Sequence, residues 1–180
     1  MLVICAGLFF NEQVHAQDGR PSAVWNMEVS ASYNAPVFYD ENVFHHLSIG
    51  IVQRSEHRLS MGVFVEGYQT LQEFGGAAFL AGSGVILRYD LIKGERYGVF
   101  TDLAGSATHA QRPVPEFGTR FNWTGRTGAG GSWKVREGLV ILAGVRFFHL
   151  SNGSLHGIRK NPGANGSQYW LGIMLPISDR

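Results

Sequence analysis

Most of the chain after residue 22 alternates between apolar and polar residues with a period of two. In the first such segment, Trp25 and Met27 share one parity, while Asn26 and Glu28 share the other. Because successive side chains point to opposite faces of a β-strand, this period predicts strands with two chemically different faces. Turn-forming residues separate eight segments of this kind, at 23–33, 43–53, 59–69, 77–91, 96–105, 121–135, 139–152 and 166–177. The pattern predicts an all-β protein of eight antiparallel strands.

The chemistry of the two faces indicates a membrane barrel. Charged residues in mid-strand fall on the polar parity: Glu28, Glu66, Arg88, Asp102, Arg126 and Arg146. The opposite parity carries large aromatic residues: Trp25, Tyr33, Tyr89, Trp123, Trp133, Phe147 and Tyr169. An apolar, aromatic-rimmed exterior around a polar interior is typical of transmembrane β-barrels of the outer-membrane type. Since acidic and basic residues balance on the inner parity, we expect a paired charge network that fills a narrow lumen.

The connections between the segments alternate in length, which predicts the orientation. Those at 54–58, 92–95 and 136–138 are short, whereas those at 34–42, 70–76, 106–120 and 153–165 are longer. Outer-membrane barrels have short periplasmic turns and longer external loops. Both termini are therefore expected on the periplasmic side, and the seventh strand is expected to end at the outer leaflet.

Composition agrees with a barrel and argues against other classes of protein. The 180 residues suit one domain, and the 24 Gly, 12 Phe and 16% charged residues favour strands and turns over long amphipathic helices. A net charge of +1 without basic runs gives no sign of a nucleic acid partner. The single cysteine, Cys5, lies in an apolar run before Val14-His15-Ala16. Residues 1–16 are therefore predicted to be a secretory signal peptide, and residues 17–180 a single barrel domain.

A candidate catalytic pair lies at the end of the seventh segment. His149 and Ser151 are two residues apart, so both side chains point to the same face, at a Cα separation of roughly 6 to 7 Å. An imidazole at this distance can reach a hydroxyl and activate it as a nucleophile. Both residues share the parity of Val145 and Phe147, the lipid-facing row. This position indicates hydrolysis of an acyl ester in an outer-leaflet lipid.

The loop after Ser151 contains candidate donors for an oxyanion. The backbone N–H groups of Gly153 and Ser154 follow the nucleophile directly, and the side-chain amide of Asn161 comes later in the same loop. Asn152 points away from Ser151, and we expect it to support the loop and the lumen. His45 and His46 point to opposite faces of one strand with no carboxylate-histidine cluster around them, so a surface role is favoured over a metal site.

Three features occur together in residues 144–175: His-x-Ser-Asn at the end of the penultimate strand, an Asn161-Pro162-Gly163 loop, and an aromatic final strand. In these features the chain resembles the PagL family of outer-membrane lipid A 3-O-deacylases. The resemblance implies an eight-stranded barrel that removes the acyl ester at position 3 of lipid A by a Ser-His-Glu triad, without a metal or another cofactor. His149 and Ser151 match the first two triad members, and Asn152 and Asn161 match positions that shape the site.

Asn165 stands where the resemblance implies the glutamate, and no carboxylate residue occurs between Ser151 and Asp179. An amide oxygen can orient an imidazole, as in Cys-His-Asn sites, but it supplies no charge to stabilise imidazolium. Asn165 is therefore the predicted third member of the site.

The resemblance implies lipid A of lipopolysaccharide as substrate and outer-membrane lipid as surroundings, and self-association of the chain is left open. Two other functions remain as alternatives. A non-catalytic outer-membrane barrel is favoured by the missing carboxylate. A soluble small-molecule binder would require the charged row to face outward.

Overall fold

The computed structural model describes residues 24–37, 42–55, 58–72, 75–155, 157 and 161–177. Eight strands run through them: β1 (Val24–Pro36), β2 (Val43–Arg54), β3 (Leu59–Gln72), β4 (Gly76–Lys93), β5 (Tyr97–Val114), β6 (Thr119–Arg136), β7 (Leu139–Ser151) and β8 (Ala164–Pro176). The signal peptide expected at residues 1–16 lies outside the described residues and remains a prediction.

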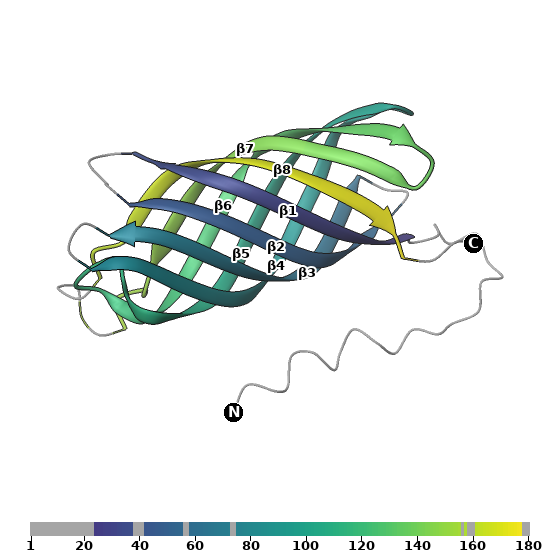
Figure 1. Cartoon of the computed structure of the whole chain (residues 1–180). Coiled ribbons are helices and arrows are strands. Elements are labelled where there is room, and N and C mark those ends of the chain that lie inside the picture. Colours follow the sequence, from purple (N-terminus) through teal and green to yellow (C-terminus); the bar gives the residue numbers. More distant parts are fainter. Residues whose placement is uncertain are drawn as a thin grey trace.

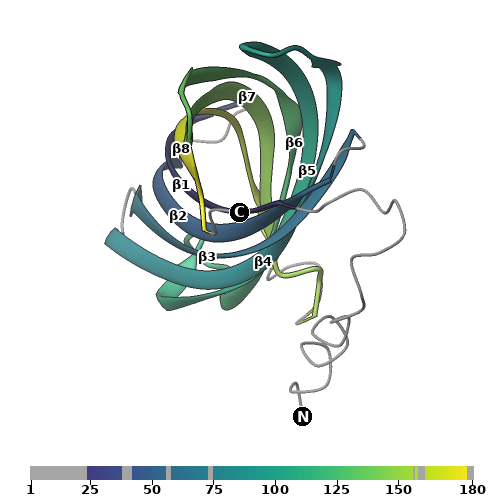
Figure 2. The ribbon, with the colours of Figure 1, turned by 90° about the vertical axis from the view of Figure 1, so that its right-hand side faces the viewer.

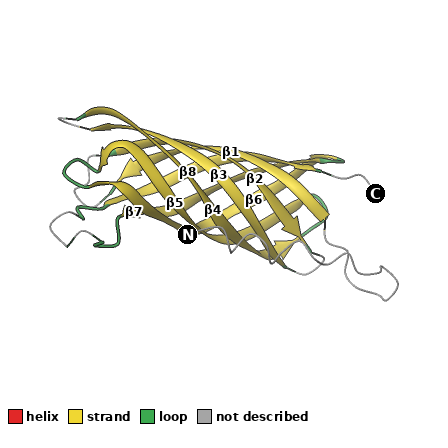
Figure 3. Cartoon of the chain, turned by 90° about the horizontal axis from the view of Figure 1, so that it is seen from below, coloured by secondary structure: helices red, strands yellow, loops and turns green. Residues whose placement is uncertain are grey.

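The strands form a closed antiparallel barrel, as predicted. Each strand pairs with its neighbours in the sequence, and β1 pairs with β8 to close the sheet (Figure 1). The turned view of Figure 2 shows the strands arranged in a ring, and Figure 3 shows that they are tilted relative to the long axis of the barrel. Within the part of the chain that the structure describes, no helix is long and apolar enough to cross a bilayer.

The two parities face as the sequence predicts. The charged residues of the inner parity are each at most 8% exposed, and they are Glu28, Glu66, Arg88, Asp102, Arg126 and Arg146. The aromatic residues of the other parity are between 41% and 54% exposed, and they are Trp25, Tyr33, Tyr89, Trp123, Trp133, Phe147 and Tyr169. A soluble binder with an apolar interior requires the reverse arrangement. The exterior is therefore the one suited to lipid.

Ion pairs fill the middle of the lumen. Each of three arginines reaches a carboxylate: Arg88 donates to Glu28 at 2.8 Å, Arg146 to Asp102 at 2.6 Å and Arg126 to Glu66 at 2.8 Å. Arg88 also lies 3.4 Å from Asp102, so two of the pairs are joined. The expectation of a paired interior network is confirmed.

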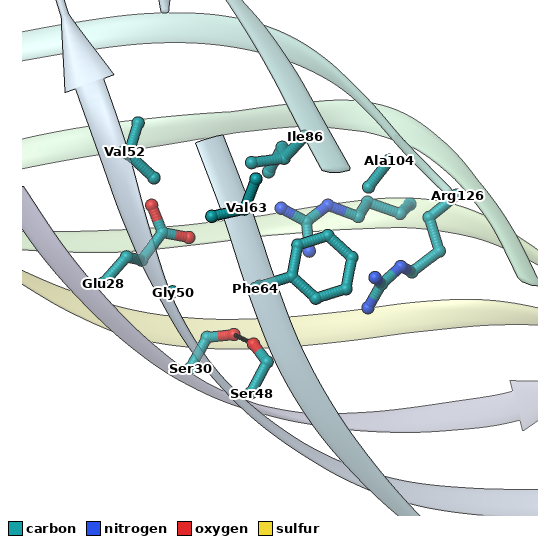
Figure 4. Close-up of a pocket in the computed structure, with 11 residues that line it drawn as sticks. Glu28, Ser30, Ser48, Gly50, Val52, Val63, Phe64, Ile86, Ala104 and Arg126 are labelled. Atoms are coloured by element: carbon teal, nitrogen blue, oxygen red, sulfur yellow. Dashed lines mark hydrogen bonds between the residues drawn. The ribbon is translucent and has the colours of Figure 1, made fainter. Parts of the chain in front are cut away.

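A small cavity interrupts the network. Figure 4 shows Glu28 and Arg126 on opposite sides of it, with the Phe64 ring between them. Its volume of about 20 Å³ is enough for water, which needs roughly 10 to 15 Å³. Ser30 and Ser48 line the same cavity and hydrogen-bond to each other at 2.8 Å.

The surface role predicted for His46 is wrong. His46 is 3% exposed, and its Nε2 lies 3.0 Å from Glu66 Oε2, while its Nδ1 lies 3.0 Å from Ser32 Oγ. Glu66 reaches His46 from the neighbouring strand, where it pairs with Ser48, two residues further along β2. A carboxylate brought close by strand pairing is not visible from the residues around His46 in the sequence. His45 is exposed, as expected from its parity.

Replacing Asp102 by alanine should destabilise the barrel. Asp102 accepts two hydrogen bonds from Arg146, and its removal leaves a buried guanidinium without its carboxylate. Breaking a buried ion pair from one side costs about 3 to 5 kcal/mol. The free energy of unfolding of the detergent-folded barrel, measured by denaturant titration, should fall by this amount. The control is Glu137→Ala, which removes an exposed partner of Lys134 and should change stability by less than about 1 kcal/mol. Equal losses in the two variants would contradict the role of the network.

Two connections differ from the sequence expectation. The predicted loop 106–120 is mostly strand, because β5 continues to Val114 and β6 begins at Thr119. The predicted loop 70–76 is also shorter, since β3 ends at Gln72 and β4 begins at Gly76. Small and polar residues do not end a strand where their backbone groups can pair with a neighbouring strand. The long connection at the end opposite the termini is the one that joins β7 to β8 and carries the candidate site.

Candidate active site

The end of β7 that lies opposite the chain termini carries the candidate pair on the outer surface of the barrel. Phe148 and Leu150 are fully buried in an apolar cluster at this end of the lumen, where Phe148 packs against Phe44 with ring centroids 5.3 Å apart. His149, between them in the sequence, is exposed, and Ser151 is half-buried. Burial of the alternate residues therefore fixes His149 and Ser151 on the lipid-facing side of the barrel.

The two residues are within hydrogen-bonding distance of each other. Nε2 of His149 lies 3.0 Å from Oγ of Ser151, and Nδ1 of His149 lies 2.8 Å from Oδ1 of Asn165. Asn165 is the direct cross-strand partner of His149 on β8. An amide oxygen can only accept a hydrogen bond, so Nδ1 of His149 carries the proton. Nε2 is then free of a proton and accepts a hydrogen bond from the Ser151 hydroxyl. This tautomer is the one that a general base requires.

Asn165 orients the imidazole but brings no negative charge. Within the described ranges, no carboxylate lies in ion-pair distance of His149. The site can therefore fix the tautomer of the histidine, and it cannot pair a developing imidazolium with an anion.

The loop after Ser151 is held by a ring of three hydrogen bonds, which we call the loop clasp (Asn152, Ser154 and Asn161). The Asn152 N–H donates to Asn161 Oδ1 at 2.8 Å, and Asn161 Nδ2 donates to Ser154 Oγ at 3.2 Å. The Ser154 N–H donates to Asn152 Oδ1 at 2.8 Å and closes the ring.

The clasp changes the set of candidate oxyanion donors. The Ser154 N–H was expected to face an oxyanion, but its hydrogen is directed to Asn152 Oδ1. Asn161 Nδ2 has two hydrogens, and one of them goes to Ser154. Among the described residues of the loop, the Gly153 N–H and the second amide hydrogen of Asn161 are therefore the donors that remain for a substrate.

Two glycines allow the loop to turn beside the site. Gly153 has φ of 63°, and a Cβ placed on it would lie 3.6 Å from Trp123. Gly163 also has φ of 63°, and a Cβ on it would lie 3.7 Å from Cε1 of His149. L-residues rarely adopt this left-handed region. Ser154 adopts it as well, with φ of 61°, and the clasp holds it there from both its N–H and its Oγ.

Sequence reasoning missed the neighbours on β6. Trp123 is the cross-strand partner of Ser151, and Gly125 is the partner of His149. Trp123 packs edge-on against Phe121 with centroids 5.2 Å apart, whereas a Cβ on Gly125 would meet no atom within 4 Å. An aromatic wall and an open space thus lie side by side next to the pair. Counting back from the short turn after Arg136 would pair Ser151 with Thr124, but a bulge near Lys134 shifts the register by one residue.

Among the described residues, no group of three or more His, Cys, Asp or Glu side chains is placed to hold a metal ion.

The sequence profile of the PagL family, described as lipid A 3-O-deacylase, matches residues 27–173. The chain belongs to this family. The match begins within β1 and ends within β8, and it includes His149, Ser151 and Asn165. Membership of the PagL family and the barrel architecture together make this a β-barrel protein of the bacterial outer membrane. A search of curated protein sequences gives no match.

Solved structures agree on the fold. The outer membrane enzyme PagL aligns with a TM-score of 0.57 at 20% identity, over 83% of this chain and 99% of that one. Neisserial surface protein A aligns with a TM-score of 0.58 at 13% identity, over 85% and 96% of the two chains. Outer membrane protein OprG from Pseudomonas aeruginosa aligns with a TM-score of 0.56 at 9% identity, over 89% and 99%. Only the first is named as an enzyme, so the barrel itself does not identify the activity.

Proposed function

We propose that this protein hydrolyses the acyl ester at position 3 of lipid A in the outer leaflet, with Ser151 as nucleophile and His149 as general base. One observation carries the proposal: the hydrogen-bonded line Asn165–His149–Ser151 lies on the lipid-facing side of a strand end, in a chain of the PagL family. A hydroxyl in this position can reach only a substrate that already lies in the membrane.

The reaction proceeds through an acyl-enzyme. Ser151 Oγ attacks the ester carbonyl and gives its proton to Nε2 of His149. The tetrahedral oxyanion accepts hydrogen bonds from the Gly153 N–H and the Asn161 amide. Its collapse breaks the ester bond, and His149 gives its proton to the departing sugar oxygen, which leaves as a hydroxyl group. Water then attacks the acyl group on Ser151 with His149 again as base, which releases the fatty acid and restores the serine.

The mass spectrum of lipid A tests the proposal. Cells that express the protein should contain lipid A lighter by one ester-linked acyl group than cells that lack it. Unchanged lipid A, with the folded barrel present in the outer membrane, would favour the second candidate function. That candidate is a non-catalytic outer-membrane barrel, and the observation in its favour is the uncharged Asn165 beside His149.

Filling the open space at Gly125 should obstruct the substrate. Gly125 lies beside His149, and a Cβ there meets no neighbour within 4 Å, so the backbone leaves room for a side chain to begin on the lipid face. Its side chain would occupy the surface over which the acyl chain has to approach. Displacement of the ester from the attacking atom should lower kcat/KM for lipid A about 10- to 100-fold. Hydrolysis of lipid A in detergent micelles measures this.

Gly131→Leu is the matched control for this prediction. Gly131 shares the outward parity of Gly125 on β6 but lies toward the periplasmic end, and the nearest neighbour of a Cβ there is 3.7 Å away. It should leave hydrolysis unchanged. Equal activity of both variants would show that the substrate does not pass over Gly125.

A further inference from the structure

The loop clasp is attached to the barrel wall at Thr119, the first residue of β6. Nδ2 of Asn152 donates to Oγ1 of Thr119 at 3.1 Å, across 33 residues of sequence. The clasp itself is made within one loop, whereas this bond joins that loop to the neighbouring hairpin of β5 and β6. Thr119 therefore connects two external segments that the sequence keeps apart.

The hydrogen bonds around Thr119 fix the direction in which its hydroxyl group donates and accepts. The Thr119 Oγ1–H donates to the backbone carbonyl of Phe121 at 2.7 Å, which leaves the oxygen lone pairs to accept from Asn152. The Thr119 carbonyl accepts from Nδ2 of Asn122 at 3.1 Å, and Asn122 is 1% exposed. Thr108 on β5 donates to the Asn122 carbonyl at 3.1 Å. The acceptor offered to Asn152 is thus fixed by the strands beneath it.

The Thr119 acceptor and the Ser154 N–H donor together hold the Asn152 amide in one orientation. With Nδ2 directed to Thr119, Oδ1 is directed to the Ser154 N–H. Ser154 Oγ in turn accepts from Asn161, the residue whose amide remains available to an oxyanion. If the acceptor at Thr119 is lost, the bond from the Ser154 N–H still holds Asn152 Oδ1, but the Asn152 amide loses its attachment to β6, and the positions of Gly153 and Asn161 relative to Ser151 are set less firmly.

We propose that Thr119 is a positioning residue of the deacylase site, which aligns the oxyanion donors through Asn152. The inference rests on the proposed function, and it adds a residue on β6 that does not touch the substrate. Because oxyanion donors act on the transition state, the loss of alignment should lower kcat and leave KM nearly unchanged.

The test compares Thr119→Val with Thr119→Ser. Valine keeps the shape of threonine and removes the hydroxyl, whereas serine keeps the hydroxyl. The valine variant should hydrolyse lipid A with kcat lowered about tenfold and KM within about twofold, since full loss of one oxyanion donor costs about 10² to 10³. The serine variant should restore kcat to near the wild-type value. The difference in gel mobility between unheated and boiled samples, which reports a folded barrel, should be the same for all variants.

Thr101→Val is the matched control. Thr101 on β5 also donates to a backbone carbonyl of β6, that of Gly128 at 2.7 Å, and it makes no contact with the clasp. Its kcat should equal that of the wild type. Wild-type kcat in Thr119→Val, or a raised KM with unchanged kcat, would overturn the proposal.

A second measurement does not depend on activity. The loop sequence contains trypsin sites at Arg159 and Lys160. Cleavage there, followed by mass spectrometry of the folded barrel, should be faster in Thr119→Val than in the wild type and in Thr119→Ser. If the wild type leaves lipid A intact, the proposed function fails, and faster cleavage still supports anchoring of the loop by Thr119. Equal cleavage in all variants overturns the anchoring.

Discussion

Replacing Ser151 by alanine is expected to abolish release of fatty acid from lipid A, with a loss of at least about 10³-fold in kcat. The same loss is expected for His149→Ala, because the hydroxyl at 3.0 Å from Nε2 is a poor nucleophile without a base. Neither side chain fills the core, since both lie on the outer side of β7, and the barrel should fold in both variants. Fatty acid release and the mass of the remaining lipid A measure the effect.

Matched variants on other strands exclude a general effect of the lipid face. Ser83→Ala on β4 and His45→Ala on β2 each remove an exposed residue of the same type away from the β7 end. Both should retain activity. Acyl loss from lipid A in the presence of the Ser151→Ala protein would reject Ser151 as the nucleophile.

Replacing Asn165 by glutamate is expected to raise turnover, and replacing it by alanine to lower it. The Asn165 oxygen at 2.8 Å from Nδ1 fixes the imidazole, so alanine removes the orientation of the base. A carboxylate in the same place would both orient the ring and stabilise the imidazolium that forms when Ser151 gives up its proton. General acid-base contributions of this kind are worth about 10² to 10⁴ in rate. Single-turnover rates on purified lipid A measure both changes.

The double variant Asn165→Glu with Ser151→Ala serves as control, and it should have no activity. An inactive Asn165→Glu protein in a correctly folded barrel, with His149 and Ser151 intact, would contradict a catalytic role for the pair. The non-catalytic barrel would then be the better description of the chain.

The stabilising ion pairs and the candidate site lie on opposite faces of the barrel wall, so a variant of the site can lose activity without losing stability. The ion pairs that stabilise the barrel, such as Arg146 with Asp102, lie inside, whereas the His149 and Ser151 side chains lie outside. A change on the outer side of β7 removes no partner of the inner network. The effects of Asp102→Ala on stability and of Ser151→Ala on turnover should therefore be nearly independent.

The sequence by itself determined the faces of the barrel and the pairing of His149 with Ser151 on one of them. Both follow from the period of two in a strand, which is a local property and is reinforced by burial of Phe148 and Leu150 on the opposite parity. The resemblance to the PagL family, carried by a short motif, also singled out Asn165.

Only the tertiary structure decided the length of β5, the burial of His46 beside Glu66, and the partners of the clasp. The residue at which a strand ends depends on whether the neighbouring strand offers backbone groups for pairing. The bulge near Lys134 shifts the pairing of β6 with β7 by one residue, so that Trp123 lies opposite Ser151. The Ser154 N–H is used within the loop, and Thr119 meets Asn152 across 33 residues. These contacts depend on where the closed barrel places segments distant in sequence, and no local pattern of residues specifies that placement.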